Sequence, residues 1–194
     1  MNPRRVVITG LGPISGLGVG IEPTWQALHS RRCAIGPIEA FDATGFASHI
    51  GSEVRDFKAN KVVPKSYRKA VKVMARDIEL AVGAADAAAR DAALVTKGTL
   101  DTGAAEGEPS YPAERIGAHI GAGLIACEVD ELTTALVEAL DEDGSFSLKK
   151  WGSEGLTNLT PLWLLKYLPN MLACHVTIIH DARGPSKTIT CNEA

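Results

Sequence analysis

The sequence lacks several features that mark specialised classes of protein. No apolar run approaches the roughly 20 residues that a membrane-spanning helix needs, and the net charge of −3 gives no electrostatic case for nucleic acid binding. The four cysteines form no C-x-x-C pair, and the five histidines show neither H-x-x-x-H nor H-E-x-x-H spacing. We therefore expect no membrane span, no nucleic acid partner, no disulfide framework and no metal, and we expect reduced thiols in a cytoplasmic protein.

The sequence does have the composition of a soluble globular protein, with 45% apolar and 22% charged residues over a length of 194. Short β-branched runs alternate with segments of helical periodicity. Strands are predicted at 4–10, 115–123 and 187–191, and helices at 21–30, 65–94, 129–140, 161–168 and 170–180. This alternation indicates an α/β protein with a largely parallel sheet and flanking helices. We interpret the Gly-, Pro- and acid-rich stretch 96–114 as a surface insertion.

A glycine-rich loop follows the first predicted strand. Its sequence, GLGPISG at 10–16, approaches the G-x-G-x-x-G fingerprint of a dinucleotide site, in which backbone N–H groups meet a pyrophosphate. That fingerprint opens directly into a helix, whereas here the predicted helix starts at Glu22–Pro23, after two more glycines. A structural turn is therefore the preferred interpretation, and no cofactor is expected. A nucleotide-binding α/β oxidoreductase is kept as an alternative.

Two histidines, His175 and His180, lie on the apolar segment 170–180. Because they are five positions apart, they do not fall squarely on one face of a helix, and no partner ligand accompanies them. We interpret them as packing histidines with satisfied hydrogen bonds rather than as metal ligands.

The stretch GPSKTITCNEA, at 184–194, holds a thiol, Cys191, and a carboxylate, Glu193. It reads as a turn, a buried strand and then an abrupt change to polar and small residues. Such an arrangement can present a side chain at a strand-to-helix junction, where a helix N-terminus lowers a thiol's pKa and supplies oxyanion-type donors. The pattern alone leaves open which of the two residues is the working group.

Several stretches, taken together, resemble the β-ketoacyl synthases, the condensing enzymes of fatty acid and polyketide synthesis. They are RRVVITGLGPISGLG, TWQAL, CAIGPIEAFDATGFASHIGSEVRDF, RIGAHIGAGL, LPNMLACHVTI and ARGPSKTIT, in the family's order. The resemblance covers nearly the whole chain apart from 96–114. It implies the N-terminal half of the thiolase fold, a homodimer or a heterodimer with a synthase subunit, and an acyl carrier protein as partner.

The resemblance also implies a position for the catalytic nucleophile. In the family this cysteine lies nine positions after the glycine of the Gly-Pro-Ser turn, and an ungapped count from Gly184 reaches Glu193 rather than Cys191. Aligning Cys191 there would draw the thiol back along the strand by about 7 Å. A carboxylate cannot hold an acyl group as a thioester. Glu193 thus implies an auxiliary protein similar to the chain-length factors, which usually carry glutamine there; an active β-ketoacyl synthase that uses Cys191 is the alternative.

Two further implications concern the acyl pocket and the rest of the fold. Leu124, which follows the G-x-G of 121–123, occupies the family position that gates the acyl pocket near the dimer contact. The family's catalytic histidines and lysine belong to the second half of the fold. Residues 1–194 are therefore expected to be a β-ketoacyl synthase N-terminal domain that is incomplete at its C-terminal end. We expect the missing half in the same or another chain, and no autonomous folding of this segment.

Overall fold

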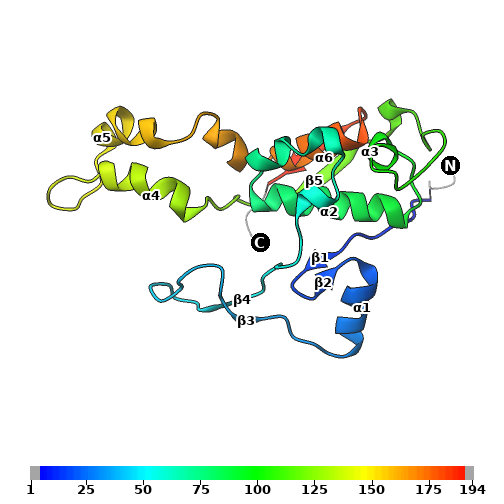
Figure 1. The fold of residues 1–194 in the computed structure, drawn as a ribbon, viewed down its shortest axis with the longest axis horizontal. Coiled ribbons are helices and arrows are strands. Elements are labelled where there is room, and N and C mark those ends of the chain that lie inside the picture. Colours follow the sequence, from blue (N-terminus) through cyan, green and yellow to red (C-terminus); the bar gives the residue numbers. More distant parts are fainter. Residues whose placement is uncertain (1–4, 191–194) are drawn as a thin grey trace.

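The body of the molecule is a pair of packed helices beside a parallel pair of strands (Figure 1). The structure, a computed structural model, describes residues 5–190. The helices are α2 (Arg76–Asp91) and α6 (Met171–His180), and the strands are β5 (Ala118–Gly121) and β6 (Ser186–Ile189). The two strands pair in the register that joins Ala118 to Ser186 and Gly121 to Ile189. This pair supplies the parallel strands that the sequence pattern predicts.

The core lies between α2 and α6. Ile78 and Val82 are four positions apart on α2, and Leu172, Val176 and Ile179 recur at steps of four and three on α6. Each helix therefore turns one apolar face to the other, and all five side chains are buried. Burial of a side chain of this size stabilises the folded state by about 1.5–3 kcal/mol, so this contact is the main support of the body.

A smaller N-terminal part lies below the body in the view of Figure 1. It contains the helix α1 (Ile21–His29), which confirms the helix predicted at 21–30. It also contains two antiparallel pairs of short strands: β1 (Ile14–Ser15) with β2 (Gly18–Val19), and β3 (Gly36–Pro37) with β4 (Ile50–Gly51). Parallel pairing among the described residues is thus confined to the body.

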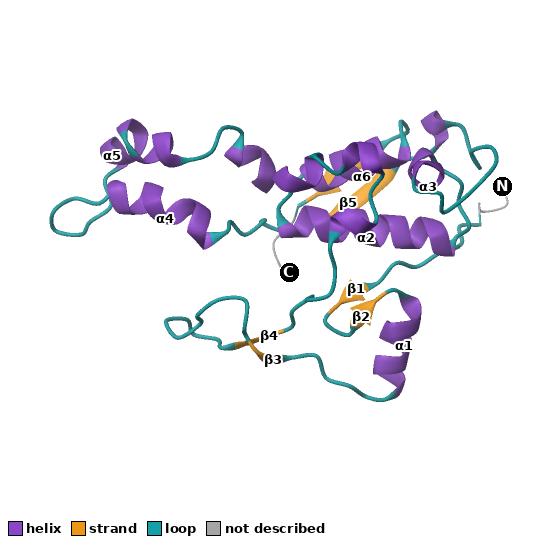
Figure 2. Ribbon diagram, in the orientation of Figure 1, coloured by secondary structure: helices purple, strands orange, loops and turns teal. Residues whose placement is uncertain are grey.

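A helical lobe extends to the other side, at the left of Figure 2. It consists of α4 (Val129–Glu138), α5 (Leu148–Ser153) and the 3₁₀ segments η5 (Gly155–Asn158) and η6 (Trp163–Tyr167). The helix predicted at 129–140 is confirmed. The helix predicted at 161–168 is only the short segment η6, because Leu162 adopts a left-handed conformation with φ 65°.

The long helix predicted over 65–94 is only partly correct. Its second half is α2, but its first half forms two 3₁₀ turns, η2 (Lys65–Tyr67) and η3 (Ala70–Val73). The break falls at Met74 and Ala75, whose backbones are extended, with ψ of 135° and 163°, and whose side chains are buried. Packing these two residues into the core outweighs the modest gain from continuing the helix.

The strand predicted at 4–10 is wrong for the residues that the structure describes. From Arg5 to Pro13 the chain pairs with no strand within residues 5–190, and Val6 and Ile8 are 92% and 83% exposed. A strand needs a neighbour for its backbone hydrogen bonds, which an apolar, β-branched sequence cannot supply by itself. The segment is held against α2 instead, where the Leu11 amide donates to Asp91 Oδ2 at 2.9 Å.

The stretch 96–114 begins with structure of its own. The helix α3 (Lys97–Asp101) has a reciprocal cap, in which Thr96 Oγ1 accepts from the Thr99 amide and Thr99 Oγ1 accepts from the Thr96 amide. A 3₁₀ turn, η4 (Ala113–Arg115), then leads into β5. The loop predicted for this stretch is therefore limited to its middle.

Candidate functional site

Two strand ends meet at one edge of the β5–β6 pair. Because the strands are parallel, their carboxyl ends lie at the same edge. The Ala122 amide, just beyond β5, donates to the Ile189 carbonyl at 3.0 Å, so the pairing continues past the end of β5. The loop 122–128 therefore starts beside the end of β6. This edge is where the sequence predicts the functional groups.

The Gly-Pro-Ser turn fixes the register at the opposite end of the pair. The Gly184 amide donates to the Ile116 carbonyl at 2.8 Å. A Cβ atom at Gly184 would lie 2.8 Å from that oxygen, and one at Gly117 would lie 2.2 Å from the Pro185 carbonyl oxygen. Both positions need glycine because the backbones approach so closely. From this point β6 pairs with β5 residue for residue, without a bulge over Ser186–Ile189.

Leu124, the predicted gate of the acyl pocket, lies in the loop 122–128 at the strand edge. Its side chain is 95% exposed, whereas the neighbouring Ile125 is buried in the core. Ile125 thus anchors the loop while Leu124 projects outward. The structure brings this loop to the end of β6, and the role of Leu124 as a gate stays a prediction.

The two candidates for the nucleophile position, Cys191 and Glu193, lie outside the described residues. The structure describes the strand that leads toward them, which ends at Ile189. For the choice between Cys191 and Glu193, the structure contributes one observation: β6 pairs with β5 in a continuous register.

A partly buried polar cluster lies where the loop 122–128 enters α4. The Tyr167 hydroxyl donates to Glu131 Oε2 at 2.7 Å and accepts from the Glu128 amide at 3.4 Å, and Lys166 forms an ion pair with Glu131 Oε1. Burial, together with the hydrogen bond to Glu131, raises the pKa of Tyr167 to about 12. This cluster cannot be predicted from the sequence, because no local spacing shows that these residues meet.

The carboxyl group of Glu131 feels opposing effects in this cluster. Burial by itself raises the pKa of Glu131, but the hydrogen bonds from Lys166 and Tyr167 outweigh it, so that the pKa lies below its ordinary value. Glu131 is therefore an ionised hydrogen-bond acceptor at neutral pH.

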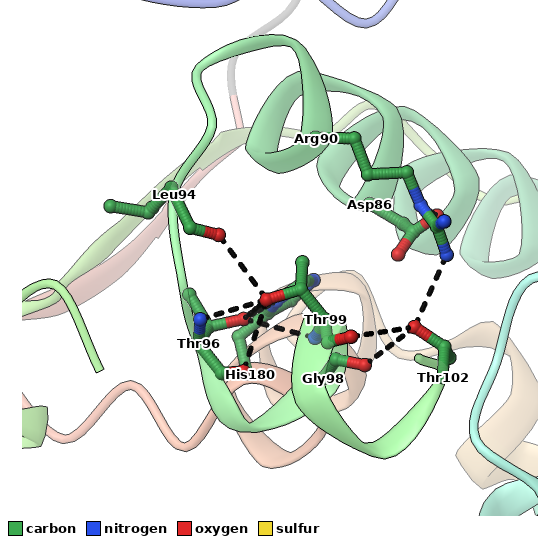
Figure 3. A network of polar contacts seen from close by, with 8 residues as sticks. All are labelled: Asp86, Arg90, Leu94, Thr96, Gly98, Thr99, Thr102 and His180. Atoms are coloured by element: carbon green, nitrogen blue, oxygen red, sulfur yellow. Dashed lines mark hydrogen bonds and ion pairs between the residues drawn. The ribbon is translucent and has the colours of Figure 1, made fainter. Parts of the chain in front are cut away.

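His175 and His180 are both buried, as expected for packing histidines. His175 Nδ1 lies 2.7 Å from the Tyr67 hydroxyl, and His180 Nδ1 lies 2.8 Å from Thr96 Oγ1 (Figure 3). Burial lowers the pKa of both imidazoles. The packing interpretation is confirmed at these nitrogens, but neither Nε2 atom has a hydrogen-bond partner among residues 5–190.

Figure 3 shows how His180 joins α6 to the start of α3. Thr96 Oγ1 accepts from the Thr99 amide and also shares a hydrogen bond with His180 Nδ1, whose direction depends on the imidazole tautomer. Nearby, Asp86 of α2 pairs with Arg90 at 2.7 Å, and Arg90 donates to Thr102 Oγ1 at 3.2 Å. This network ties α2, α3 and α6 together, which is a structural role.

The glycine-rich loop forms a hairpin rather than a nucleotide cradle. β1 and β2 pair within it, and α1 begins only after Gly20, whose φ of 91° suits glycine. The strand–loop–helix geometry of a dinucleotide site is therefore not found in residues 5–190. Over the same residues, no three His, Cys, Asp or Glu side chains gather as metal ligands would. No described helix combines the length and the apolar character needed to cross a bilayer.

Comparison with known proteins decides the family. The sequence model of the "Beta-ketoacyl synthase, N-terminal domain" matches residues 3–194. This chain belongs to the β-ketoacyl synthase family. The match includes the stretch 96–114, which the sequence resemblance left out. Together with the hairpin in the glycine-rich loop, it removes the basis for a nucleotide-binding oxidoreductase.

A similar curated protein is 3-oxoacyl-[acyl-carrier-protein] synthase 2 of Synechocystis, which is 31% identical over 98% of this chain. The chain spans 39% of that protein's length. The ishigamide ketosynthase/chain length factor has a TM-score of 0.64 at 25% identity, over 96% of this chain and 40% of that chain. The α/β class and the N-terminal half of a thiolase-like β-ketoacyl synthase fold are confirmed.

A further solved structure shares the fold of this chain. It is a type II PKS acyl-carrier protein in complex with its ketosynthase, with a TM-score of 0.61 at 14% identity. The match covers 95% of this chain and 41% of that chain. At this identity the likeness concerns the fold alone.

Proposed function

We propose that this chain is part of an auxiliary, chain-length-factor-like protein of fatty acid or polyketide synthesis. The observation that carries the proposal is the count from Gly184, which puts Glu193 where the family has its acyl-accepting cysteine. An acyl group on a carboxylate would be an anhydride rather than a thioester, so Glu193 does not replace the cysteine as acyl acceptor. In the proposed role, the chain therefore does not condense acyl groups.

The described part of β6 supports the ungapped count. It pairs with β5 without a bulge, and the close contacts of Gly117 and Gly184 lock the start of the pair. Aligning Cys191 with the nucleophile would mean removing two residues from this run, which would displace the thiol by about 7 Å.

The proposed task of the chain is to shape the acyl tunnel of a synthase complex. Leu124, exposed beside the strand edge, is the proposed gate of that tunnel. The proposed partners are an acyl carrier protein and a synthase subunit, in a homodimer or a heterodimer. The second half of the fold would come from the same chain or another chain, and the proposed location is the cytoplasm.

Covalent acylation tests the proposal. The full-length protein, incubated with an acyl carrier protein thioester, is expected to show no acyl adduct by intact-protein mass spectrometry. Restoring a thiol by Glu193→Cys should create an adduct, whereas the matched control Cys191→Ser should change nothing. An adduct on Cys191 in the unaltered protein would overturn the proposal.

One observation favours a second candidate, an active β-ketoacyl synthase with Cys191 as its nucleophile. The similar Synechocystis protein carries the name of a synthase. Cys191 would then accept the acyl group, and a decarboxylative Claisen condensation would follow. In that case Cys191→Ser would abolish the adduct and the product, and Glu193→Gln would leave the adduct in place.

A further inference from the structure

The loop 122–128, which carries Leu124, has few backbone tethers. Ala122 is bonded to Ile189 at its start. For residues 123–128, the one amide with a hydrogen-bond partner within residues 5–190 is that of Glu128, which donates to the Tyr167 hydroxyl at 3.4 Å. The described contacts that hold the loop are therefore its ends, the buried Ile125 side chain, the packing of Ala122 and Cys127 against the core, and this hydrogen bond.

Tyr167 is itself held firmly. Its side chain is 7% exposed and belongs to the same core cluster as Ile125. Trp163 lies beside it, with ring centroids 5.0 Å apart. The hydroxyl uses both of its roles, since it donates to Glu131 and accepts from Glu128. A ring with a fixed position can therefore fix the loop that is bonded to it.

Glu131 and Lys166 orient the Tyr167 hydroxyl. Their ion pair joins the first turn of α4 to η6, and the Lys166 ammonium also lies 5.6 Å from the centre of the Tyr167 ring. An ionised Glu131 can only accept, so the Tyr167 hydroxyl donates its hydrogen bond to Glu131 and its oxygen lone pairs remain available to the Glu128 amide. Cys127 also faces this cluster, and burial raises the pKa of its thiol.

We propose that Tyr167 is a positioning residue, which fixes the backbone of residues 124–128 and thereby the direction in which Leu124 projects. Glu131 supports it by accepting from its hydroxyl, and Lys166 holds Glu131 through their ion pair. Any effect of the Leu124 direction on the acyl tunnel rests on the proposed function of Leu124 as a gate. The restraint that Tyr167 places on the loop does not depend on that function.

Hydrogen exchange on the full-length protein tests the restraint. Tyr167→Phe removes the hydroxyl and keeps the ring, and is expected to raise exchange at the Glu128 amide about fivefold, as for the loss of one ordinary hydrogen bond. Tyr67→Phe is the matched control, since that hydroxyl lies beside His175 in the same core and not at the loop. Unchanged loop exchange in Tyr167→Phe, or an equal rise in Tyr67→Phe, overturns the proposal.

A third variant separates the hydroxyl from the ion pair. Glu131→Gln removes the charge but retains an acceptor oxygen for Tyr167, so the loop should stay protected. Faster loop exchange in Glu131→Gln would assign the restraint to the ion pair and overturn the role of the hydroxyl.

Product length separates this proposal from the proposed function. With the partner synthase subunit, Leu124→Ala and Tyr167→Phe are expected to shift the distribution of product lengths in the same direction, and Tyr67→Phe should leave it unchanged. A shift in Leu124→Ala alone overturns the positioning role. If Tyr167→Phe loosens the loop and neither variant shifts the products, the proposed function fails and the restraint on the loop stands.

Discussion

Single residues make the contacts that join distant segments of this chain. His180, at the end of α6, is buried and reaches Thr96 across 84 positions of sequence. Gly98 approaches so closely that a Cβ atom there would lie 3.0 Å from His180 Nδ1. Because Nε2 has no partner among the described residues, the imidazole contributes through packing and through one hydrogen bond.

We expect His180→Ala to lower the free energy of unfolding by about 2–4 kcal/mol, because it empties a packed site and removes the hydrogen-bond partner of the Thr96 hydroxyl. Urea denaturation of the full-length protein measures this change. His49→Ala, at an exposed position, is the matched control and should change the free energy by less than about 0.5 kcal/mol. Equal effects of the two substitutions would contradict the structural role of His180.

Tyr167 and Glu131 give the stability of the fold a defined pH dependence. Burial and the bond to Glu131 raise the pKa of Tyr167 from 10.0 to about 12, so its contribution is complete below pH 10.0 and is lost as the pH rises to about 12. The pKa of Glu131 lies below its ordinary value of 4.5, so its contribution is present above pH 4.5 and is lost in acid.

The alkaline limb of this profile can be measured by urea denaturation of the full-length protein between about pH 9 and about pH 12. Tyr167→Phe is expected to make the decline in stability shallower, because phenylalanine has no proton to lose. Tyr111→Phe, at an exposed tyrosine, serves as the control and should keep the slope of the unaltered protein. An identical slope in Tyr167→Phe would refute the assigned contribution.

The burial or role of a residue could be predicted from the sequence only where the pattern that indicates it lies within one continuous segment. The burial of His175 and His180 follows from their apolar segment, whereas the role that the family motif suggests for Leu124 stays a prediction. The contact of Tyr167 with Glu131 could not be predicted, since 36 positions separate the two and no local pattern shows which turns meet. The nucleophile position rests on counting, because Cys191 and Glu193 lie outside the described residues.

Among the elements, helices were more predictable than strands. The helices α1, α4 and α6 form close to their predicted ranges, because a helix satisfies its own backbone and needs only one apolar face to pack. The strand predicted at 4–10 depends on a partner that local sequence cannot specify, and it is not formed in the described residues. The break before α2 cannot be predicted for a similar reason, since burial of Met74 is decided by tertiary packing.

Glycine at position 12 allows the N-terminal segment to pack closely against α2. A Cβ atom at Gly12 would lie 2.1 Å from the Ala84 carbonyl oxygen, which is a backbone atom of the helix. We expect Gly12→Ala to destabilise the protein by about 1–3 kcal/mol, because either the segment or α2 must shift. Urea denaturation measures the loss. Gly45→Ala is the matched control, since a Cβ there meets nothing within 4 Å, and a loss as large as that of Gly12→Ala would contradict the steric argument.

Over the whole molecule, large apolar side chains are exposed on all three parts. Val6 and Trp25 are exposed in the N-terminal part, Leu124 at the strand edge, and Leu148 and Leu164 on the helical lobe. A monomeric domain rarely exposes so much apolar surface, which normally marks contact with further protein. The chain spans 39% of the length of the Synechocystis relative. We propose that further protein, in the same chain or another, makes that contact.

We therefore expect residues 1–194, produced alone, to associate and to unfold without a single cooperative transition. The described body has one α2–α6 core, whereas the N-terminal part and the lobe carry exposed apolar side chains that a larger fold would cover. Light scattering gives the mass in solution, and thermal unfolding followed by circular dichroism and by tryptophan fluorescence tests cooperativity. A monomer whose two transitions coincide would contradict the prediction, because the α2–α6 core would then suffice to fold all three parts.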